Sequence, residues 1–518
     1  MATLHELEDE YFPGAELGDP HSQDTRLTPH VDGQPYFGAI ADLLDTLTGQ
    51  GDRVYITSWN LESTVKLRGG AGEPTLAQRL VTLAASKADV RLVVAVPRYS
   101  LGRQGAPLWD SDGWGQAAFS LGIGPYARQN IASVHALRAM PPTGGGPPPL
   151  ENRVLVDWGG GNDSRHEKCT IVYSADTGHL HAFVGGIDYE PRRFCTPGHN
   201  LAPAGNWWHD MGVHLEGGAA ASALSNFWTR WDETATLPAG RRYWYDGRSR
   251  VFNPSIAAKP AQLAPAAPAP APPAPGGSYD DTSIRIWRSY DTVRVRTLTF
   301  SENVPWATLP ATGVHEVARG LANAIDKAET YVYVEDQGIN PNRFAAAYSR
   351  YDKLYPVLAD ACRRGVKVIL VSQGYSGETG LLVRANLSYS QLLYDDVYQQ
   401  LTATQQENLA VFYVRDVKVH SKLMLVDDEF LSVGSANFWD RSQLGTESEL
   451  HVAVVHPGEE NSFVADVRVQ LWREHLRLTV GPVVDGALRD LSQSLGCFRD
   501  SWGTGVPAPN SAFVEVTP

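Results

Sequence analysis

The sequence has few lysines and few cysteines, and it contains no long apolar run. Its 44 basic residues include only 9 lysines and are outnumbered by 58 Asp and Glu, so the formal net charge is −14. Proteins that bind DNA or RNA through the phosphate backbone need clustered Lys and Arg, and a chain this acidic offers no broad surface of that kind. We therefore expect no nucleic-acid partner.

Cysteine usage and hydropathy exclude two further classes of protein. No disulfide framework or metal-ligand spacing is visible in the four cysteines, Cys169, Cys195, Cys362 and Cys497. No apolar run approaches the ~18–20 residues that span a bilayer, and the acidic start of the chain is unlike a secretory signal. The expectation is a cytoplasmic protein, or a secreted one if a leader has been removed.

Length and one proline-rich segment predict the division into domains. A single hydrophobic core rarely grows beyond ~250–300 residues, so 518 residues are expected to form two domains or one large duplicated unit. Residues 257–279 are rich in Pro and Ala and almost free of charge, which is typical of an extended linker. We predict an N-terminal lobe over 1–256, the linker over 257–279 and a C-terminal lobe over 280–518.

The two halves on either side of this linker read alike. Each contains a helical stretch, two strands, a segment with His-x-Lys, a glycine turn and a strand that carries a carboxylate, in the same order. The matching segments are 54–60 and 331–337, 88–97 and 363–372, 166–173 and 420–428, 183–188 and 431–437, and 209–217 and 446–455. This pattern predicts a duplicated α/β fold: two mixed, parallel-rich sheets flanked by helices, with the active site between the lobes.

The strongest single feature is the tripeptide His-x-Lys, which occurs at His166/Lys168 and again at His420/Lys422. Side chains two residues apart on a strand point to the same face, so each pair presents an imidazole and an ammonium group together. Composition alone would give about 0.3 such tripeptides in this chain, so two at equivalent places of a repeat argue for a shared function. A lone histidine on a strand, by contrast, is usually a half-buried structural residue.

Two imidazoles and two ammonium groups form a compact cationic pocket that suits one phosphodiester, because Lys acts as a point charge on phosphoryl oxygens. One neutral imidazole can attack phosphorus while one imidazolium protonates the leaving oxygen; the acid then becomes a base that activates water or an alcohol. Ser435 and Asn437, in the second glycine turn, can donate to the same oxygens. No His, Asp or Glu cluster has convincing metal-ligand spacing, so no metal and no other cofactor is expected.

Each imidazole also needs an acceptor at its second nitrogen, which holds the ring in the correct tautomer. Asp210 in the first half and Glu449 in the second follow the glycine turns and are placed for this task. Isolated carboxylates are more often surface charges, and it is the alignment of the repeat that favours an orienting role. The opposite protonation states required of the two histidines predict a bell-shaped pH profile.

The second half carries a known motif. The pattern His420-x-Lys422-x4-Asp427, followed by Gly-Ser-x-Asn at 434–437, resembles the signature of the phospholipase D superfamily in full. The resemblance covers most of the chain. The segments that are similar to phosphatidylcholine-hydrolysing phospholipases D are 183–188, 208–210, 215–217, 227–231 and 423–442.

This resemblance implies a bilobal α/β fold, no required metal at the active centre and a covalent phosphohistidine intermediate. It also implies hydrolysis of a phospholipid head-group ester, or transfer of the phosphatidyl group to an alcohol. By motif position, His166 resembles the nucleophile and His420 the general acid, although this sequence alone does not order the two. The residues that resemble phosphate binders are Lys168, Lys422 and Asn437, and substrate contacts are expected from Asp188, Gly186 and Ser435.

The first motif departs from the family pattern, because Tyr173 stands five residues after Lys168 where the pattern has an aspartate. That aspartate lies beyond the phosphate-binding pair on its strand, so we expect its role to be structural, with Asp176 as the replacement. Cys169, beside Lys168, is expected to be a small buried apolar residue rather than a reactive thiol.

Three functions stay open at this point. The first is a phospholipase D-type enzyme acting on a phospholipid, with water or an alcohol as acceptor and transient contact with a membrane surface. The second applies the same chemistry to a non-lipid phosphodiester, either a specialised metabolite or nucleic acid, and the third is an impaired protein that only binds phospholipid. The aromatic segment 109–126 fits core packing better than an acyl-binding mouth. The high Arg and Ala and low Lys content is typical of a GC-rich bacterial genome.

Overall fold

The computed structural model describes most of both halves of the chain. The described residues are 3–12, 14, 21–96, 125–157, 164–196, 208–235, 243–245, 249–251, 282–290, 313–339, 354–373, 393, 397–414, 417–438, 440–443, 447–458, 462–476, 478, 481–491 and 513–515. The predicted linker 257–279 and nearly all of the aromatic segment 109–126 lie outside them. Within the described ranges, no helix combines the length and apolar character needed to cross a membrane.

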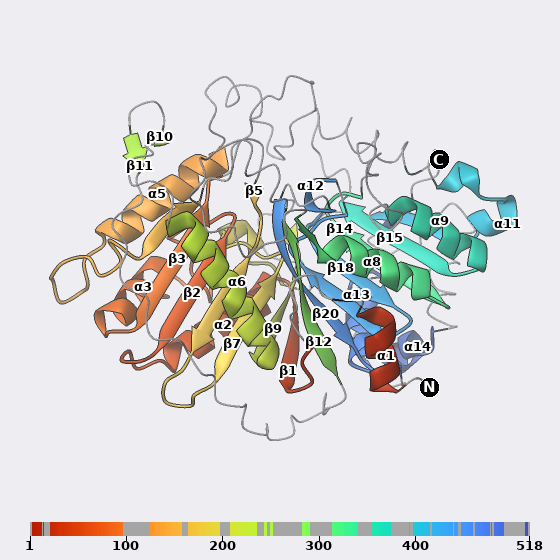
Figure 1. Ribbon diagram of the computed structural model, residues 1–518, viewed down its shortest axis with the longest axis horizontal. Helices are drawn as coiled ribbons and strands as arrows, with labels where there is room; N and C mark the ends of the chain where they lie inside the picture. Colours follow the sequence, from red (N-terminus) through yellow and green to blue (C-terminus); the bar gives the residue numbers. More distant parts are fainter. Residues whose placement is uncertain are drawn as a thin grey trace.

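The first lobe is built on a seven-stranded sheet (Figure 1). In order across the sheet, its strands are β1 (Thr25–Val31), β9 (Met211–Gly217), β7 (Leu180–Gly185), β6 (Cys169–Tyr173), β2 (Arg53–Ser58), β3 (Asp89–Ala95) and β4 (Val154–Asp157). The motif strand β6 lies in the middle of the sheet, so the side chains at its start are held by strands on both sides.

The second lobe repeats this sheet strand for strand. Its core order is β12 (Ser283–Tyr290), β20 (Glu447–Val455), β19 (Phe430–Gly434), β18 (Lys422–Val426), β14 (Tyr331–Asp336), β15 (Lys367–Gln373) and β16 (Leu409–Val414). Two further strands, β13 (Val314–His315) and β21 (Phe513–Glu515), extend its edges. Because the order and the directions of seven strands agree between the lobes, the predicted duplication and the predicted pair of mixed sheets are confirmed.

The expectation that the sheets are rich in parallel pairs is wrong in detail. In the first sheet, only β2–β3 and β3–β4 are parallel, and the other four pairs are antiparallel. The second sheet repeats this division. The reason is that no helix stands between the motif strand and the glycine-turn strand, so a short turn joins them as an antiparallel hairpin.

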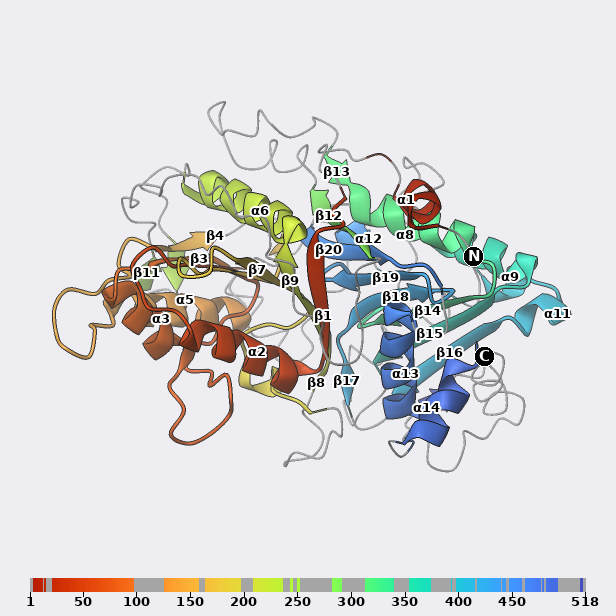
Figure 2. The same cartoon turned by 90° about the horizontal axis from the view of Figure 1, so that it is seen from below.

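Helices cover both faces of each sheet. In the first lobe, α2 (Gly33–Asp45), α3 (Leu76–Ala85) and α5 (Pro125–Ala139) pack on one face, and α6 (Gly218–Ala235) packs on the other (Figure 2). In the second lobe, α8 (Glu316–Lys327) and α9 (Leu354–Arg364) lie opposite α13 (Phe463–His475). The remaining elements are α11 (Ala403–Gln406), α12 (Asp440–Gln443), α14 (Pro482–Arg489), η1 (Pro191–Arg193), η4 (Tyr398–Gln400), and the hairpin β10 (Tyr243–Tyr245) with β11 (Ser249–Val251).

Local sequence explains where these helices form. Helix α8 buries Val317, Leu321 and Ile325 at helical spacing, as the apolar periodicity predicts. Helix α3 begins with a capping box, in which Thr75 and Gln78 satisfy each other's main-chain N–H groups. This cap fixes the start of α3, and the apolar stripe of a helix fixes which side meets the sheet.

One hydrophobic core runs through both lobes. It joins side chains of the first sheet and α6 to side chains of the second sheet and α13, including Val184, Trp231, Val433 and Trp472. Transferring apolar surface from water is the main force that stabilises folded chains, and here that force also acts between the lobes. The lobes are therefore packed together as one body around their shared boundary.

At this boundary, short strands of the first lobe pair with strands of the second lobe. From the first lobe, β5 (Ser164–Arg165) pairs in parallel with β20 of the second lobe. Likewise β8 (Trp208–His209) pairs in parallel with β17 (Lys418–Val419), and these two lie side by side between the lobes (Figure 2). Each crossing strand ends immediately before a residue of the predicted site, so the crossings fix the site's geometry.

The N-terminal helix belongs by its packing to the second lobe. Helix α1 (Leu4–Tyr11) buries Leu7 and Tyr11 in a core with α8 and α9, and Tyr11 stacks on Phe430 at 5.1 Å between ring centroids. The predicted N-terminal lobe, 1–256, thus includes a helix that covers the opposite lobe and ties the two halves together.

The motif aspartate has a structural task, as expected. Asp427 accepts hydrogen bonds from the main-chain N–H groups of three successive residues, 329–331, at 2.7–2.9 Å. It therefore joins the turn after β18 to the start of β14. In the first lobe the acceptor and donor are exchanged between the two segments. Asp52, just before β2, accepts a hydrogen bond from the N–H of Ala175 at 2.8 Å, and Ala175 lies in the turn after β6. The expectation that Asp176 replaces the aspartate is wrong, since Asp176 is exposed and Asp52 makes the contact.

These contacts predict a difference in stability between two aspartates on equivalent turns. Asp427→Ala should lower the free energy of unfolding by about 1–3 kcal/mol, because three main-chain N–H groups lose their acceptor. Asp176→Ala, on the exposed turn of the first lobe, should change it by less than ~0.5 kcal/mol. Urea unfolding followed by tryptophan fluorescence measures both. Equal losses in the two variants would show that the tie does not exist.

Candidate active site

The two His-x-Lys segments meet at the lobe boundary, and main-chain hydrogen bonds set their register. The N–H of His166 donates to the carbonyl of Ser448 at 3.1 Å, and the N–H of His420 donates to the carbonyl of His209 at 2.7 Å. The residues that follow these two carbonyls are Glu449 and Asp210. The crossing strands thus bring each histidine beside a carboxylate of the opposite lobe.

The carboxylates complete this exchange. Nδ1 of His420 lies 2.7 Å from Oδ2 of Asp210, and Nδ1 of His166 lies 3.1 and 3.2 Å from the two carboxylate oxygens of Glu449. The sequence predicts that Asp210 and Glu449 orient the histidines but does not say which orients which. In the structure each carboxylate serves the histidine of the other lobe.

These contacts define the tautomer of both imidazoles. All acceptors lie at Nδ1, including the carbonyl of Ser435 at 3.0 Å from Nδ1 of His166, so Nδ1 carries the hydrogen. The neutral ring then has its lone pair on Nε2. A nitrogen held in this state is suited to attack an electrophile or to carry a proton to and from one.

Each lysine is held by its own motif and faces a buried carboxylate. Nζ of Lys168 donates to the carbonyl of His166 at 2.7 Å, and Nζ of Lys422 donates to the carbonyl of His420. Asp188 lies 3.7 Å from Nζ of Lys168. In the second lobe, the residue paired with Lys422 across the strands is Asp336, at the end of β14.

The carboxyl groups beside the two lysines therefore come from different positions in the two halves of the repeat. Asp188 follows β7, and the residue at the equivalent position of the second lobe is Asn437. Asp336 instead accepts hydrogen bonds from the main-chain N–H groups of Gly338 and Phe438, at 2.8 and 3.0 Å. Carboxyl groups thus lie beside both lysines, and burial raises the pKa of Asp336 to about 8.

Asn437 is the unpaired polar side chain of the site. It is fully buried, and neither its amide oxygen nor its amide nitrogen has a hydrogen-bond partner among the described residues. Its main-chain carbonyl accepts from Nε2 of Gln443 at 2.6 Å, which fixes the turn. A buried amide left without partners is costly, so it is suited to a bound group that accepts its N–H.

Arg193 belongs to the site and was missed by sequence reasoning. This buried side chain, from η1, lies 3.4 Å from Asp188, 3.7 Å from Asp210 and, through Nη2, 3.5 Å from Nε2 of His420. Its guanidinium also stacks on the ring of Trp208 at 3.4 Å. The sequence signal was two adjacent arginines in the short segment after the glycine turn.

The three residues predicted to bind substrate make their contacts within the protein. The hydroxyl of Ser435 donates to Oε2 of Glu449 at 2.6 Å, and Ser442 donates to the other oxygen. A Cβ at Gly186 would lie 2.1 Å from Oδ1 of Asp210, so only glycine leaves room for this carboxylate. Asp188 is the partner of Lys168 and Arg193, and its negative charge would repel a phosphate. All three arrange the groups that surround the pocket.

A tryptophan packs beside each histidine. Trp208 contacts His420 at 4.9 Å between ring centroids, and Trp59 contacts His166 at 5.6 Å, both edge to face. The ring of Trp59 also contacts that of Tyr126, the last residue of the aromatic segment 109–126, at 5.0 Å between centroids with the rings tilted. Aromatic walls limit the rotation of the imidazoles and exclude water from them.

Burial shifts the pKa values of both histidines and of several other groups in the pocket. It lowers the pKa of His166 to about 3, with help from Lys168, and lowers that of His420 well below its usual value together with Arg193 and Lys422. It also lowers the pKa of Lys422 to about 8 and raises that of Asp210 to about 6. Both imidazoles are therefore neutral near pH 7 in the absence of a ligand.

A second buried network supports Asp210 from behind. Its neighbour His209 lies 3.0 Å from Glu335, 2.9 Å from Glu474 and 3.2 Å from Asp32. Burial opposes charge on His209, but the three carboxylates outweigh it and raise the pKa of the imidazole well above its usual value. Glu335 also accepts from His475 at 2.7 Å. Charges from both lobes are thus paired directly next to the site.

The fold also brings together His, Asp and Glu side chains that could hold a metal ion. The sequence predicts no such cluster. Among the described residues there are four groups of three side chains in which one donor atom per residue lies within 4.8 Å of the others. They are His166 with Glu447 and Glu449, His209 with Glu335 and His475, His209 with Asp32 and Glu474, and His179 with His181 and Glu216. The members come from different strands, so sequence spacing does not reveal them. The first three are part of the networks above, and only the last lies away from the lobe boundary.

The chain is similar to several known proteins. The family described as "Cardiolipin synthase, PLD-like domain" matches residues 322–473. Phospholipase D delta of Arabidopsis thaliana is 24% identical over 416 residues, covering 61% of this chain and 48% of that protein. Phospholipase D alpha 2 of Brassica oleracea var. capitata is 24% identical over 568 residues, covering 89% and 66%. Phosphatidylserine synthase of Haemophilus influenzae Rd KW20 is similar in structure, with a TM-score of 0.49, 10% identity and coverage of 94% and 96%.

Each lobe of the duplicated α/β fold supplies one His-x-Lys segment, and the two segments meet in one site at the lobe boundary. The fold and the site thus define a two-lobed protein with a single shared pair of histidines. The match of residues 322–473 to the PLD-like domain and the similarity to plant phospholipases D support membership of the phospholipase D superfamily. It spans about half to two thirds of the length of the two plant relatives named above.

Proposed function

We propose that the chain is a phospholipase D-type phosphodiesterase that cleaves the head-group ester of a phospholipid through a phosphohistidine intermediate. The observation that carries the proposal is the exchange of carboxylates between the lobes. Asp210 and Glu449 each hold the Nδ1–H of the opposite histidine, which leaves both Nε2 atoms for chemistry. A protein that used these histidines only for packing would not need two oriented imidazoles beside two lysines.

In the first step, Nε2 of neutral His166 attacks phosphorus. A P–N bond forms and the P–O bond to the head group breaks, while His420 gives its Nε2 proton to the departing oxygen. The phosphodiester anion and Asp210 favour the protonated form of His420 once substrate is bound, although the empty pocket disfavours it. The products are phosphatidyl-His166 and the free head-group alcohol.

In the second step, His420 reverses its role. Its neutral Nε2 takes a proton from water or from an alcohol, whose oxygen attacks phosphorus as the P–N bond breaks. Water gives a phosphatidic acid, and an alcohol gives a new phosphatidyl ester. The second step regenerates neutral His166 and protonated His420, and neither step calls for a metal or cofactor.

Four groups are available to hold the phosphoryl oxygens. Lys168 and Lys422 supply ammonium groups, and Asn437 supplies the amide that has no partner within the described residues. We add Arg193, which lies 3.5 Å from the reacting nitrogen of His420. Fixed donors of this kind stabilise the charge that builds up on phosphorus in the transition state.

The lipid substrate is supported by relatives that carry the name phospholipase D. The test is a mixture of the purified chain, phosphatidylcholine and ethanol, which should yield phosphatidylethanol. His166→Ala and His420→Ala should each reduce the rate at least ~10³-fold, because each removes one of the two reacting groups. His456→Ala is the matched control and should react at the parental rate, because Nδ1 of His456 lies 2.7 Å from the neighbouring carbonyl of Pro457 and His456 is not part of the site.

The outcomes separate the candidate functions. No transfer or hydrolysis on a panel of phospholipids would reject the lipid substrate, and cleavage of a soluble phosphodiester in the same experiment would favour the non-lipid alternative. Lipid binding without any cleavage would identify an inactive binding protein. Full activity in His166→Ala would reject the mechanism itself.

The pKa values of the pocket predict how the reaction depends on pH. Asp210 must be ionised to hold His420, so activity should fall as pH drops below about 6, where this carboxyl gains a proton. Lys422 must be charged to bind the phosphoryl oxygens, so activity should fall again above about 8, where the ammonium loses its proton. Measured as kcat/KM with a short-chain phosphatidylcholine, the profile should be bell-shaped between these limits. A profile that stays flat from pH 5 to 9 would contradict the assignment.

A further inference from the structure

A group of histidines lies on the first sheet, away from the lobe boundary. The sequence places His179-Leu180-His181 at the start of β7 and His214-Leu215-Glu216 near the end of β9. Residues two apart on a strand share a face, and His181 stands directly opposite Glu216 in the antiparallel register. The pattern His-x-His against His-x-Glu therefore gathers four nitrogen and oxygen donors on one face. The group lies roughly 17 Å along β7 from Gly186, which is too far for contact with the catalytic residues.

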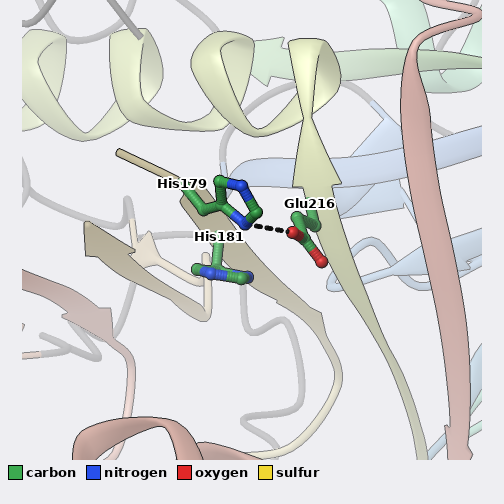
Figure 3. Close-up of side chains that lie close together, drawn as sticks. All are labelled: His179, His181 and Glu216. Carbon is green, nitrogen blue, oxygen red and sulfur yellow. Dashed lines mark ion pairs between the residues drawn. The ribbon is translucent and has the colours of Figure 1, made fainter. Parts of the chain in front are cut away.

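Three of these side chains converge on a common point. Nδ1 of His179 lies 2.6 Å from Oε1 of Glu216, and the ring of His181 lies beside them (Figure 3). One donor atom from each of the three residues lies within 4.8 Å of the others. Two ligands of a tetrahedral zinc ion, at about 2.0–2.1 Å from the metal, are separated by about 3.3 Å. Small rotations of the side chains bring the three donors to that spacing.

His214 holds the central ligand. Its Nε2 lies 3.0 Å from Nδ1 of His181, and its ring stacks on Phe183 at 4.2 Å between centroids. When Nδ1 of His181 donates to His214, Nε2 of His181 is the nitrogen with a lone pair. Metal-ligating histidines almost always have their second ring nitrogen held in this way by a neighbouring acceptor.

The surroundings leave the ligands reachable from solvent. His179 and Glu216 are partly exposed, with 24% and 14% of their side-chain surface accessible, so an ion can enter from solvent. Arg26 lies 3.4 Å from Oε2 of Glu216, and that contact leaves Oε1 for the metal.

We infer that His179, His181 and Glu216 bind a divalent transition-metal ion of the zinc class, with water completing the coordination and His214 as the outer partner of His181. Two imidazoles and one carboxylate are a ligand set that zinc accepts, and hard ions such as Mg²⁺ prefer oxygen ligands alone. The ion would join the start of β7 to the end of β9, immediately before α6 begins at Gly218. It would therefore stabilise the first lobe without taking part in phosphodiester chemistry.

Titration of the chelator-treated full chain with Co²⁺, followed by visible absorption and by competition with Zn²⁺, tests the inference. The parent chain should bind one Co²⁺ ion, seen as a change in visible absorption. Zn²⁺, but not Mg²⁺, should displace the bound Co²⁺. His181→Gln and Glu216→Gln should each weaken binding at least ~10-fold, because each removes one ligand. The partly exposed His179→Gln serves as a third variant with little risk to folding, which circular dichroism checks.

Two controls separate this site from other histidines. His456→Gln removes a histidine outside any of the four donor groups, and His166→Gln removes the donor in the active site. Both should bind Co²⁺ as tightly as the parent. The inference is overturned if the parent binds no ion, if the three ligand variants bind as the parent does, or if His166→Gln abolishes the signal. Because the readout is metal binding, its result is independent of the proposed enzymatic activity.

Discussion

The site depends on one constraint, which is that each lobe supplies the carboxylate that orients the other lobe's histidine. Two main-chain hydrogen bonds, from His166 to Ser448 and from His420 to His209, set this exchange, because the orienting carboxylates are the next residues along the chain. Neither lobe by itself holds both members of either pair, His420 with Asp210 or His166 with Glu449. The shared hydrophobic core and the paired charges around His209 therefore serve the chemistry as well as stability, since any slip between the lobes would separate both pairs at once.

The duplicated halves have kept this arrangement while changing the residues that provide it. In both lobes an aspartate joins the motif turn to the adjacent strand by main-chain hydrogen bonds. In the second lobe this is Asp427, on the turn, and in the first lobe it is Asp52, next to the strand. The carboxylate beside each lysine shows the same exchange, coming from Asp188 in one lobe and from Asp336 in the other. This second exchange has a chemical consequence, because it leaves Asn437 uncharged and unpaired among the described residues. Loss of a motif residue is thus weak evidence for loss of function when the partner of its contact has changed as well.

Much of this was predictable from sequence, and the parts that were not have a common cause. Strand periodicity and the repeat predict the duplicated α/β fold, and the spacing of His-x-Lys predicts which side chains share a face. The sequence cannot reveal which carboxylate reaches which histidine, because that depends on strands that cross between lobes. For the same reason Arg193, Asp336 and the His179–Glu216 group were missed, since each becomes meaningful only through a neighbour far away in the sequence. Parallel pairing was overestimated because hairpins and helical crossovers both begin with a short apolar strand.

The claim that two imidazoles from opposite lobes act on one phosphorus atom is tested most directly by trapping the covalent intermediate. A phosphodiester with a p-nitrophenol leaving group needs no acid for the first step, so His420→Ala should still form the adduct and should fail to hydrolyse it. Acid quenching and peptide mapping should then find the phosphoryl group on residue 166 in His420→Ala, in greater amount than in the parent chain, and should find none in His166→Ala. An absence of adduct at residue 166 in the parent and in His420→Ala, with p-nitrophenol still released at the parental rate in His166→Ala, would contradict the account.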